Sequence, residues 1–199
     1  MAGITPSQTI GPFSAFALTP QEAGKSYPGA QLAGSDLITP DTTGERIHIE
    51  GRMFDGDGAP IPGTLLEIWQ ADAHGRYAHP ADTRASSNAS FKGFGRAETD
   101  ADGRFAFDTI KPGGVPGPNG AMQAPHIVLA IHMRGLMIHL YSRIYFSDEA
   151  ANASDPILAL VPAQRRDTLM ATRDASRPGA VYRFDLHVQS ERETVFFDI

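Results

Sequence analysis

The side chains that could do chemistry in this sequence are oxygen and nitrogen donors, since none of its 199 residues is a cysteine. That absence excludes disulfides, thiolate metal sites and a cysteine nucleophile, and it leaves His, Tyr, Asp and Glu as candidate metal ligands. His126 and His132 share a strand face if the strand is regular, but six residues at ~3.3 Å place them about 20 Å apart. One ion cannot bridge that separation, although strand pairing could bring His139 of the next apolar segment closer.

Arg134 is a candidate for binding a carboxylate. It follows the apolar run Ile127–Met133 and precedes Gly135. Its guanidinium presents a rigid fork of donors, which fits the two oxygens of a carboxylate. The alternatives are a solvated charge at the end of a strand and an ion pair with another chain.

Short strands and turns must position these residues, because the chain has 20 glycines, 15 prolines and too much hydrophobic content for disorder. Alternating apolar residues predict strands, and the segments Asp55–Gly58 and Asp100–Gly103 are typical of hairpin turns. The predicted strands are Arg46–Phe54, Leu65–Trp69, Arg104–Ile110, Ile127–Ile131, Met137–Phe146, Val181–Val188 and Thr194–Phe197. One helix is predicted at Pro162–Thr172, with proline at its start.

The chain is predicted to be mostly β. Its expected architecture is a mostly antiparallel β-sandwich with an extended N-terminal arm, long loops and one short helix. Residues 1–45 have little periodicity and many prolines, so we expect an arm that packs on a partner chain, with disorder as the alternative. Residues 46–199 contain no linker that would separate two cores. They are therefore expected to form one domain.

Charge and hydropathy narrow the choice of partner and compartment. The net charge of −6 gives no broad basic field for nucleic acid. No apolar run approaches the ~18 residues of a membrane span, and the first 18 residues lack the pattern of a signal peptide. A cytoplasmic location without a nucleic-acid or membrane partner is therefore expected.

Segments along nearly the whole chain resemble the intradiol ring-cleaving dioxygenases. They are Thr5–Thr9 with Gly11–Phe13, Gly58–Gly63, Leu66–Tyr77, Ile110–Gly113, Ala124–Ile127, Tyr182–Asp185 and Glu193–Asp198. Each segment is a weak signal alone, but their order is specific. The resemblance implies a β-sandwich enzyme chain that cleaves the ring of a catechol with O2 at a non-haem Fe(III) centre.

The resemblance also implies a set of iron ligands, namely two tyrosines and a His-x-His pair on one strand. Tyr77 and His126 match this pattern, but Val128 and Val115 stand where the second histidine and the second tyrosine are expected. We therefore expect that this chain binds no iron, that Tyr77 and His126 are remnants of the pattern, and that Fe(III) belongs to a homologous iron-binding beta chain. The alternative is a degenerate metal site at Tyr77 and His126.

The role that the resemblance leaves to this chain is to complete the substrate pocket of its partner in a hetero-oligomer. Thr9, Gly11 and Pro12 of the arm match the family's contribution to that pocket, as does Arg134, which would bind the carboxylate of 3,4-dihydroxybenzoate. The implied product is 3-carboxy-cis,cis-muconate, in the beta-ketoadipate pathway of aromatic degradation. For the arm segment, a purely structural turn is the alternative.

Two other functions stay open at this point. One is a self-sufficient homo-oligomeric intradiol dioxygenase with an atypical ligand set. The other is a transthyretin-like β-sandwich that serves as a binding or scaffold module without catalysis, because a fold alone does not establish activity.

Overall fold

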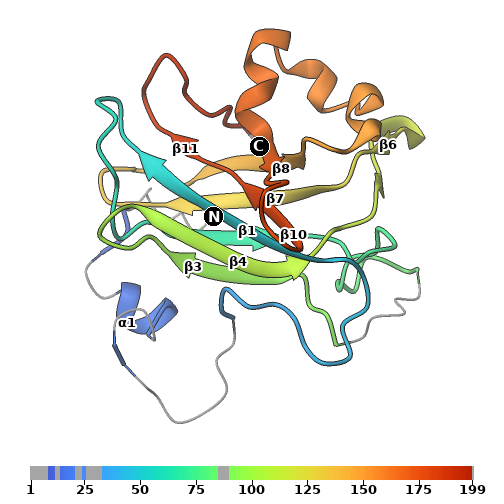
Figure 1. Cartoon of the computed structure of the whole chain (residues 1–199), viewed down its shortest axis with the longest axis horizontal. Coiled ribbons are helices and arrows are strands. Elements are labelled where there is room, and N and C mark those ends of the chain that lie inside the picture. Colours follow the sequence, from blue (N-terminus) through green and yellow to red (C-terminus); the bar gives the residue numbers. More distant parts are fainter. Residues whose placement is uncertain (1–8, 12–13, 21–23, 26–32, 85–89, 199) are drawn as a thin grey trace, which may run out of the picture.

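The computed structural model describes residues 9–11, 14–20, 24–25, 33–84 and 90–198 (Figure 1). Its helices are α1 (Ser14–Leu18) and the 3-10 helices η1 (Pro118–Gly120), η2 (Ala150–Ser154), η3 (Leu158–Leu160) and η4 (Ala163–Leu169). Its strands are β1 (Arg46–Phe54), β2 (Leu65–Trp69), β3 (Phe94–Glu98), β4 (Arg104–Ile110), β5 (Val115–Pro116), β6 (Met122–Gln123), β7 (His126–His132), β8 (Leu140–Phe146), β9 (Met170–Arg173), β10 (Ala180–Arg183) and β11 (Leu186–His187).

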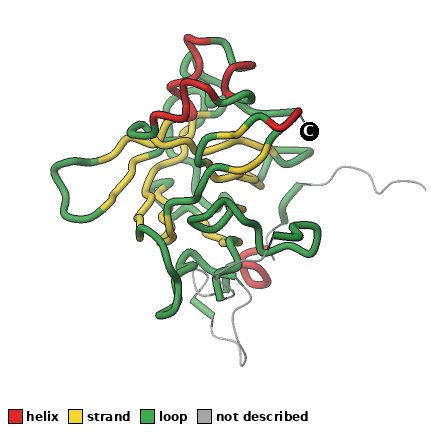
Figure 2. Tube along the Cα trace, turned by 90° about the vertical axis from the view of Figure 1, so that its right-hand side faces the viewer, coloured by secondary structure: helices red, strands yellow, loops and turns green. Residues whose placement is uncertain are grey.

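Nine of these strands form one curled sheet, in the order β11-β1-β10-β9-β8-β7-β2-β3, with β4 paired to β1. β4 approaches β3, the last strand in this order, so the sheet nearly closes around the core (Figure 1). β5 and β6 form a separate two-stranded sheet. Helices η2 to η4 lie at one end of the molecule and α1 at the opposite end (Figure 1, Figure 2).

The mostly β prediction is confirmed. The sheet, however, is mixed and nearly closed, so it is not clearly the mostly antiparallel sandwich that was predicted. β1 runs parallel to β10 and β11, and β8 runs parallel to β9. Parallel neighbours require crossover connections, and here the segment from β8 to β9 crosses over through helices η2 to η4. Hydrophobic alternation cannot reveal this, because it reports which face of a strand is buried and not the direction of its neighbour.

The core lies inside the curl of the sheet. Ile47, Ile49 and Met53 of β1 are buried, as their alternate spacing requires, and Phe105 and Phe107 of the adjacent β4 join them. β7 contributes three further buried residues to the same cluster, Ile127, Leu129 and Ile131. The buried face of β7 thereby fixes the positions of both ends of this strand. His126 lies at its first residue, and Arg134 follows its last.

The two predicted hairpin turns form, but neither joins two strands that pair with each other in a ladder. Asp55 and Asp100 each accept backbone hydrogen bonds at the start of their turns, from Gly58 and Gly103. Yet β1 pairs with β4, β10 and β11 rather than β2, and β3 pairs with β2 rather than β4. The turn residues reverse the direction of the chain, while burial of the strand faces determines which strands pair.

Two predicted elements near the C-terminus differ from the structure. The expected helix Pro162–Thr172 is a 3-10 helix that ends at Leu169, and the next residues enter β9. The expected strand Thr194–Phe197 makes an isolated bridge between Phe197 and Tyr141 instead of a ladder. The arm also contains an unexpected five-residue helix, α1. In the described parts of the chain, no helix has the length and apolarity needed to cross a membrane.

Candidate functional site

Thr9, Gly11 and Arg134 meet at one end of the sheet. Gly11 and Arg134 line a cavity of about 190 Å³, together with residues of α1, β2 and β3. Thr9 lies at the same place, because its hydroxyl donates to the carbonyl oxygen of Met133 at 3.3 Å. Cavities of about 150 Å³ hold benzene, so the size suits one aromatic ring. Pro12 falls outside the described residues.

Hydrogen bonds made by two described residues, Thr9 and Thr19, attach the arm to this end of the sheet. The first is the contact of Thr9 with Met133, in the turn between β7 and β8. In the second, the hydroxyl of the buried Thr19 donates to the carboxylate of Glu98 at the end of β3. Between them, Ser14 at the start of α1 donates its backbone N–H to the carbonyl of Gly11 at 3.1 Å. The arm therefore forms one wall of the cavity.

Arg134 supplies a cation to the cavity. Its guanidinium makes no ion pair or hydrogen bond with any part of the chain that the structure describes. Gly63 lies beside it, since a Cβ added there would be 3.6 Å from Nη2 of Arg134 and 3.7 Å from Oε1 of Glu98. The cavity thus combines an aromatic-sized volume, the guanidinium of Arg134 and one half-buried carboxylate that is engaged by Thr19.

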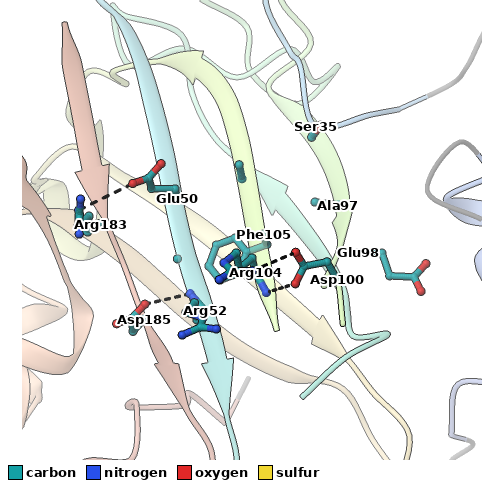
Figure 3. A pocket seen from close by; sticks show the side chains of 12 residues that line it. Ser35, Glu50, Arg52, Ala97, Glu98, Asp100, Arg104, Phe105, Arg183 and Asp185 are labelled. Carbon is teal, nitrogen blue, oxygen red and sulfur yellow. Dashed lines mark hydrogen bonds and ion pairs between the residues drawn. The ribbon is translucent and has the colours of Figure 1, made fainter. Parts of the chain in front are cut away.

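A larger groove of about 660 Å³ lies over β1 and β4, but its charges are already paired (Figure 3). Arg183 faces Glu50 at 3.8 Å, and Arg104 lies 3.9 Å from Asp100. Asp185 accepts the backbone N–H of Arg52 at 2.9 Å. A groove whose ions neutralise one another offers little to a charged ligand, so we do not assign a site to it.

His126 begins β7, at the end of this strand opposite to the cavity. Its ring is buried, and Nδ1 must carry the proton, because it lies 2.7 Å from the carbonyl oxygen of Ala124. Burial, and then the positive charge of Arg143, lower the pKa of His126 to about 4. The imidazole is therefore neutral at pH 7.

Tyr77 lies in the loop after β2 and stacks on Trp69, with ring centroids 5.9 Å apart. Burial raises the pKa of its phenol. Val115, which stands where a second phenol was expected, lines the same surface hollow as Tyr77. A half-buried phenol whose pKa is raised stays protonated, and beside an apolar side chain it is a poor ligand for Fe(III), which requires anionic oxygen.

The donors in this region do not fit an iron centre. Val128, at the position of the second histidine, faces Arg143 across the β7–β8 ladder, so a cation lies where a further donor would be needed. His132 and His139 cannot substitute, because they lie together at the opposite end of β7, with ring centroids 5.3 Å apart. Among the described residues, no group of three His, Asp or Glu side chains could hold a metal ion.

Sequence reasoning missed several members of these two regions. Thr19, Gly63 and Glu98 line the cavity because of tertiary contacts, which the periodicity of a sequence does not predict. Arg143 had a signal, namely a charged residue inside the apolar segment Met137–Phe146. A buried or half-buried charge in a strand needs partners, and this requirement would have marked Arg143 for attention.

Comparison with known proteins places the chain in a family. A family described as "Dioxygenase" matches residues 29–190. The protocatechuate 3,4-dioxygenase alpha chain of Burkholderia cepacia is 46% identical over 98% of this chain and 97% of its own length. The beta chain from that organism is 37% identical over 76% of this chain and 67% of its own length. The crystal structure of 3-chlorocatechol 1,2-dioxygenase from Rhodococcus opacus 1CP covers 81% of this chain and 67% of that chain, with a TM-score of 0.63 and 25% identity. These matches show that the chain belongs to the intradiol dioxygenase family.

Proposed function

We propose that this chain acts as the alpha chain of a protocatechuate 3,4-dioxygenase and completes the substrate pocket of an iron-binding beta chain. The observation that carries the proposal is the guanidinium of Arg134, which has no charged or hydrogen-bonding partner among the described residues, in a cavity of aromatic size walled by the arm around Thr9 and Gly11. This cavity lies at one end of β7, and the remnants of the ligand pattern lie at the other. In this proposal, the substrate site is separate from the partial ligand pattern at Tyr77 and His126.

The proposed reaction joins 3,4-dihydroxybenzoate and O2 and cleaves the ring between the two hydroxylated carbons, which gives 3-carboxy-cis,cis-muconate. When bound in the partner, Fe(III) supplies the redox chemistry of this cleavage. Arg134 binds the substrate carboxylate with charge-assisted hydrogen bonds, and the backbone near Gly11 lets the ring approach closely. Pro12, which lies outside the described residues, belongs to the same proposal as a residue of the arm.

The partner belongs to the proposal as well. Separate alpha and beta chains are known among the relatives, and this chain resembles both. In this proposal, the arm packs on the beta chain. The fold is a β-sandwich whose two layers are the opposite sides of the curled sheet. The cytoplasmic location is part of the same proposal.

Arg134→Ala in the coexpressed complex tests the role of the guanidinium. We expect kcat/KM for 3,4-dihydroxybenzoate to fall by the equivalent of about 1.5–3 kcal/mol, the range of hydrogen bonds to charged groups, with a smaller loss for catechol. Arg134→Lys should recover part of the loss, because it retains the charge without the fork. The measurement is oxygen uptake with both substrates.

Arg192→Ala serves as the matched control, because Arg192 is an exposed arginine that does not line the cavity. It should leave the ratio of the two substrates unchanged. Equal losses for both substrates in Arg134→Ala would contradict the assignment. An iron-free homo-oligomer that binds aromatic acids without consuming oxygen would instead support a binding module.

A further inference from the structure

The strand pair that carries His126 also carries an arginine. In the β7–β8 ladder, His126 is directly opposite Tyr145, and Val128 is directly opposite Arg143. Directly opposed residues share a face of the sheet, with their Cβ atoms about 4.5–5.5 Å apart. A second imidazole at position 128 would therefore lie alongside a permanent cation.

Several groups hold this cation in place. Nη1 of Arg143 donates to Oε1 of Gln123 at 2.7 Å and to the phenol oxygen of Tyr145 at 3.3 Å. The guanidinium carbon lies 5.8 Å from the ring centroid of Phe197, within the range of a cation–π contact. The tyrosine in turn donates to Oδ1 of Asp155 at 3.2 Å. The charge is thus fixed by neighbours on both sides and is not a mobile surface group.

The carboxylate at the end of this chain of contacts is buried. Asp155 is 1% exposed and accepts backbone N–H groups from Ala124 at 2.7 Å and from Leu158 at 2.6 Å. Buried anions require compensation, and the nearby guanidinium provides it through the phenol of Tyr145. The guanidinium also lies near His126, because Tyr145, which accepts a hydrogen bond from Arg143, has its ring centroid 5.7 Å from that of His126. Its positive charge acts to lower the pKa of both Tyr77 and His126.

We propose that the guanidinium of Arg143 occupies the role of the metal cation in this chain, held near Tyr77 and His126, and that it excludes a metal ion by charge as well as by geometry. Missing donors alone would leave a weak site that supplied ligands could restore. A guanidinium already at the site opposes metal binding more strongly than missing donors do, because like charges repel strongly in a partly buried setting. Restoring the donors is then insufficient unless the arginine is removed.

The test compares Fe(III) binding by the purified full chain in two donor-restored variants. Val115→Tyr with Val128→His supplies the expected donors and keeps Arg143, and the second variant adds Arg143→Gln. Glutamine retains an N–H donor for Gln123 and Tyr145 but carries no charge. We expect the affinity to rise at least about 100-fold when the charge is removed. The readouts are the visible tyrosinate-to-iron absorption and iron retained after desalting.

A second pair of variants guards against misfolding, because Val115 is buried. Val128→His is compared with and without Arg143→Gln by Co(II) titration, followed by visible absorption. Adding Arg192→Gln instead of Arg143→Gln removes an exposed charge that makes none of the contacts described above, and it should not improve binding. Equal metal affinity with and without Arg143 in either pair would overturn the proposal. No turnover is measured, so this result is independent of the proposed function.

Discussion

At the scale of residues, Arg134, Arg143 and His126 show how the surroundings of a side chain determine its role. Arg134 is exposed and free of partners among the described residues, which suits it to an incoming anion. Arg143 is half-buried and engaged by Gln123 and Tyr145, which suits it to a structural charge. His126 is buried and neutral because its surroundings disfavour the imidazolium. Environment therefore gives side chains of the same type different roles.

The buried imidazole predicts a pH dependence of stability. The pKa of His126 is about 4 in the folded chain and ordinarily about 6.5, so the unfolded chain takes up the proton first as the pH falls. The free energy of unfolding should therefore decrease between pH 6.5 and pH 4, by about 3 kcal/mol from this group. Urea unfolding across that range measures the effect.

His126→Asn provides the control for this prediction. The asparagine amide can still donate to the carbonyl of Ala124, but it does not titrate. The variant should lose less stability than the natural chain between pH 6.5 and pH 4, by the amount given above. Identical pH profiles for the two proteins would show that His126 is not buried in its neutral form.

At the scale of elements, the arm and α1 depend on a few attachments for their position. The bond from Thr19 to Glu98 joins the C-terminal side of α1 to β3, and the bond from Thr9 to Met133 joins its N-terminal side to the β7–β8 turn. α1 itself has five residues, too few for a stable isolated helix. The tertiary attachments must therefore hold the wall of the cavity.

Thr19→Val removes one attachment while keeping the shape of the side chain. We expect amide hydrogen exchange in α1 to accelerate about tenfold, the consequence of losing a hydrogen bond to a charged acceptor. Thr19→Ser keeps the hydroxyl and should exchange like the natural chain, and the amides of β1 should change in neither variant. Unchanged exchange in α1 after Thr19→Val would mean that other contacts hold the arm.

The elements also show what the sequence can predict. The bounds of β1 and β4 follow from alternation and an adjacent Asp-Gly turn, because these signals are local. The parallel pairing of β8 with β9 could not be predicted, since it depends on how a crossover packs. The resemblance pointed to Arg134, Thr9 and Gly11, whereas Glu98 and Thr19 reach the cavity from segments far apart in the sequence.

At the scale of the whole molecule, the two candidate regions lie at opposite ends of β7. Six residue steps separate His126 from His132, about 20 Å along the strand, and Arg134 lies just beyond. The cavity contains a cation and an apolar wall but no set of metal donors among the described residues. The proposed function therefore takes the redox centre for ring cleavage from a homologous iron-binding partner.

The most direct test of this account is iron content and oxygen uptake for the chain purified alone and for the chain coexpressed with its beta partner. We expect less than about one-tenth of an iron per chain when the protein is alone, and no turnover of 3,4-dihydroxybenzoate, because two of four donors are missing. The complex should contain about one iron per pair of chains and consume oxygen with that substrate. Stoichiometric iron and turnover in the isolated chain would contradict the account.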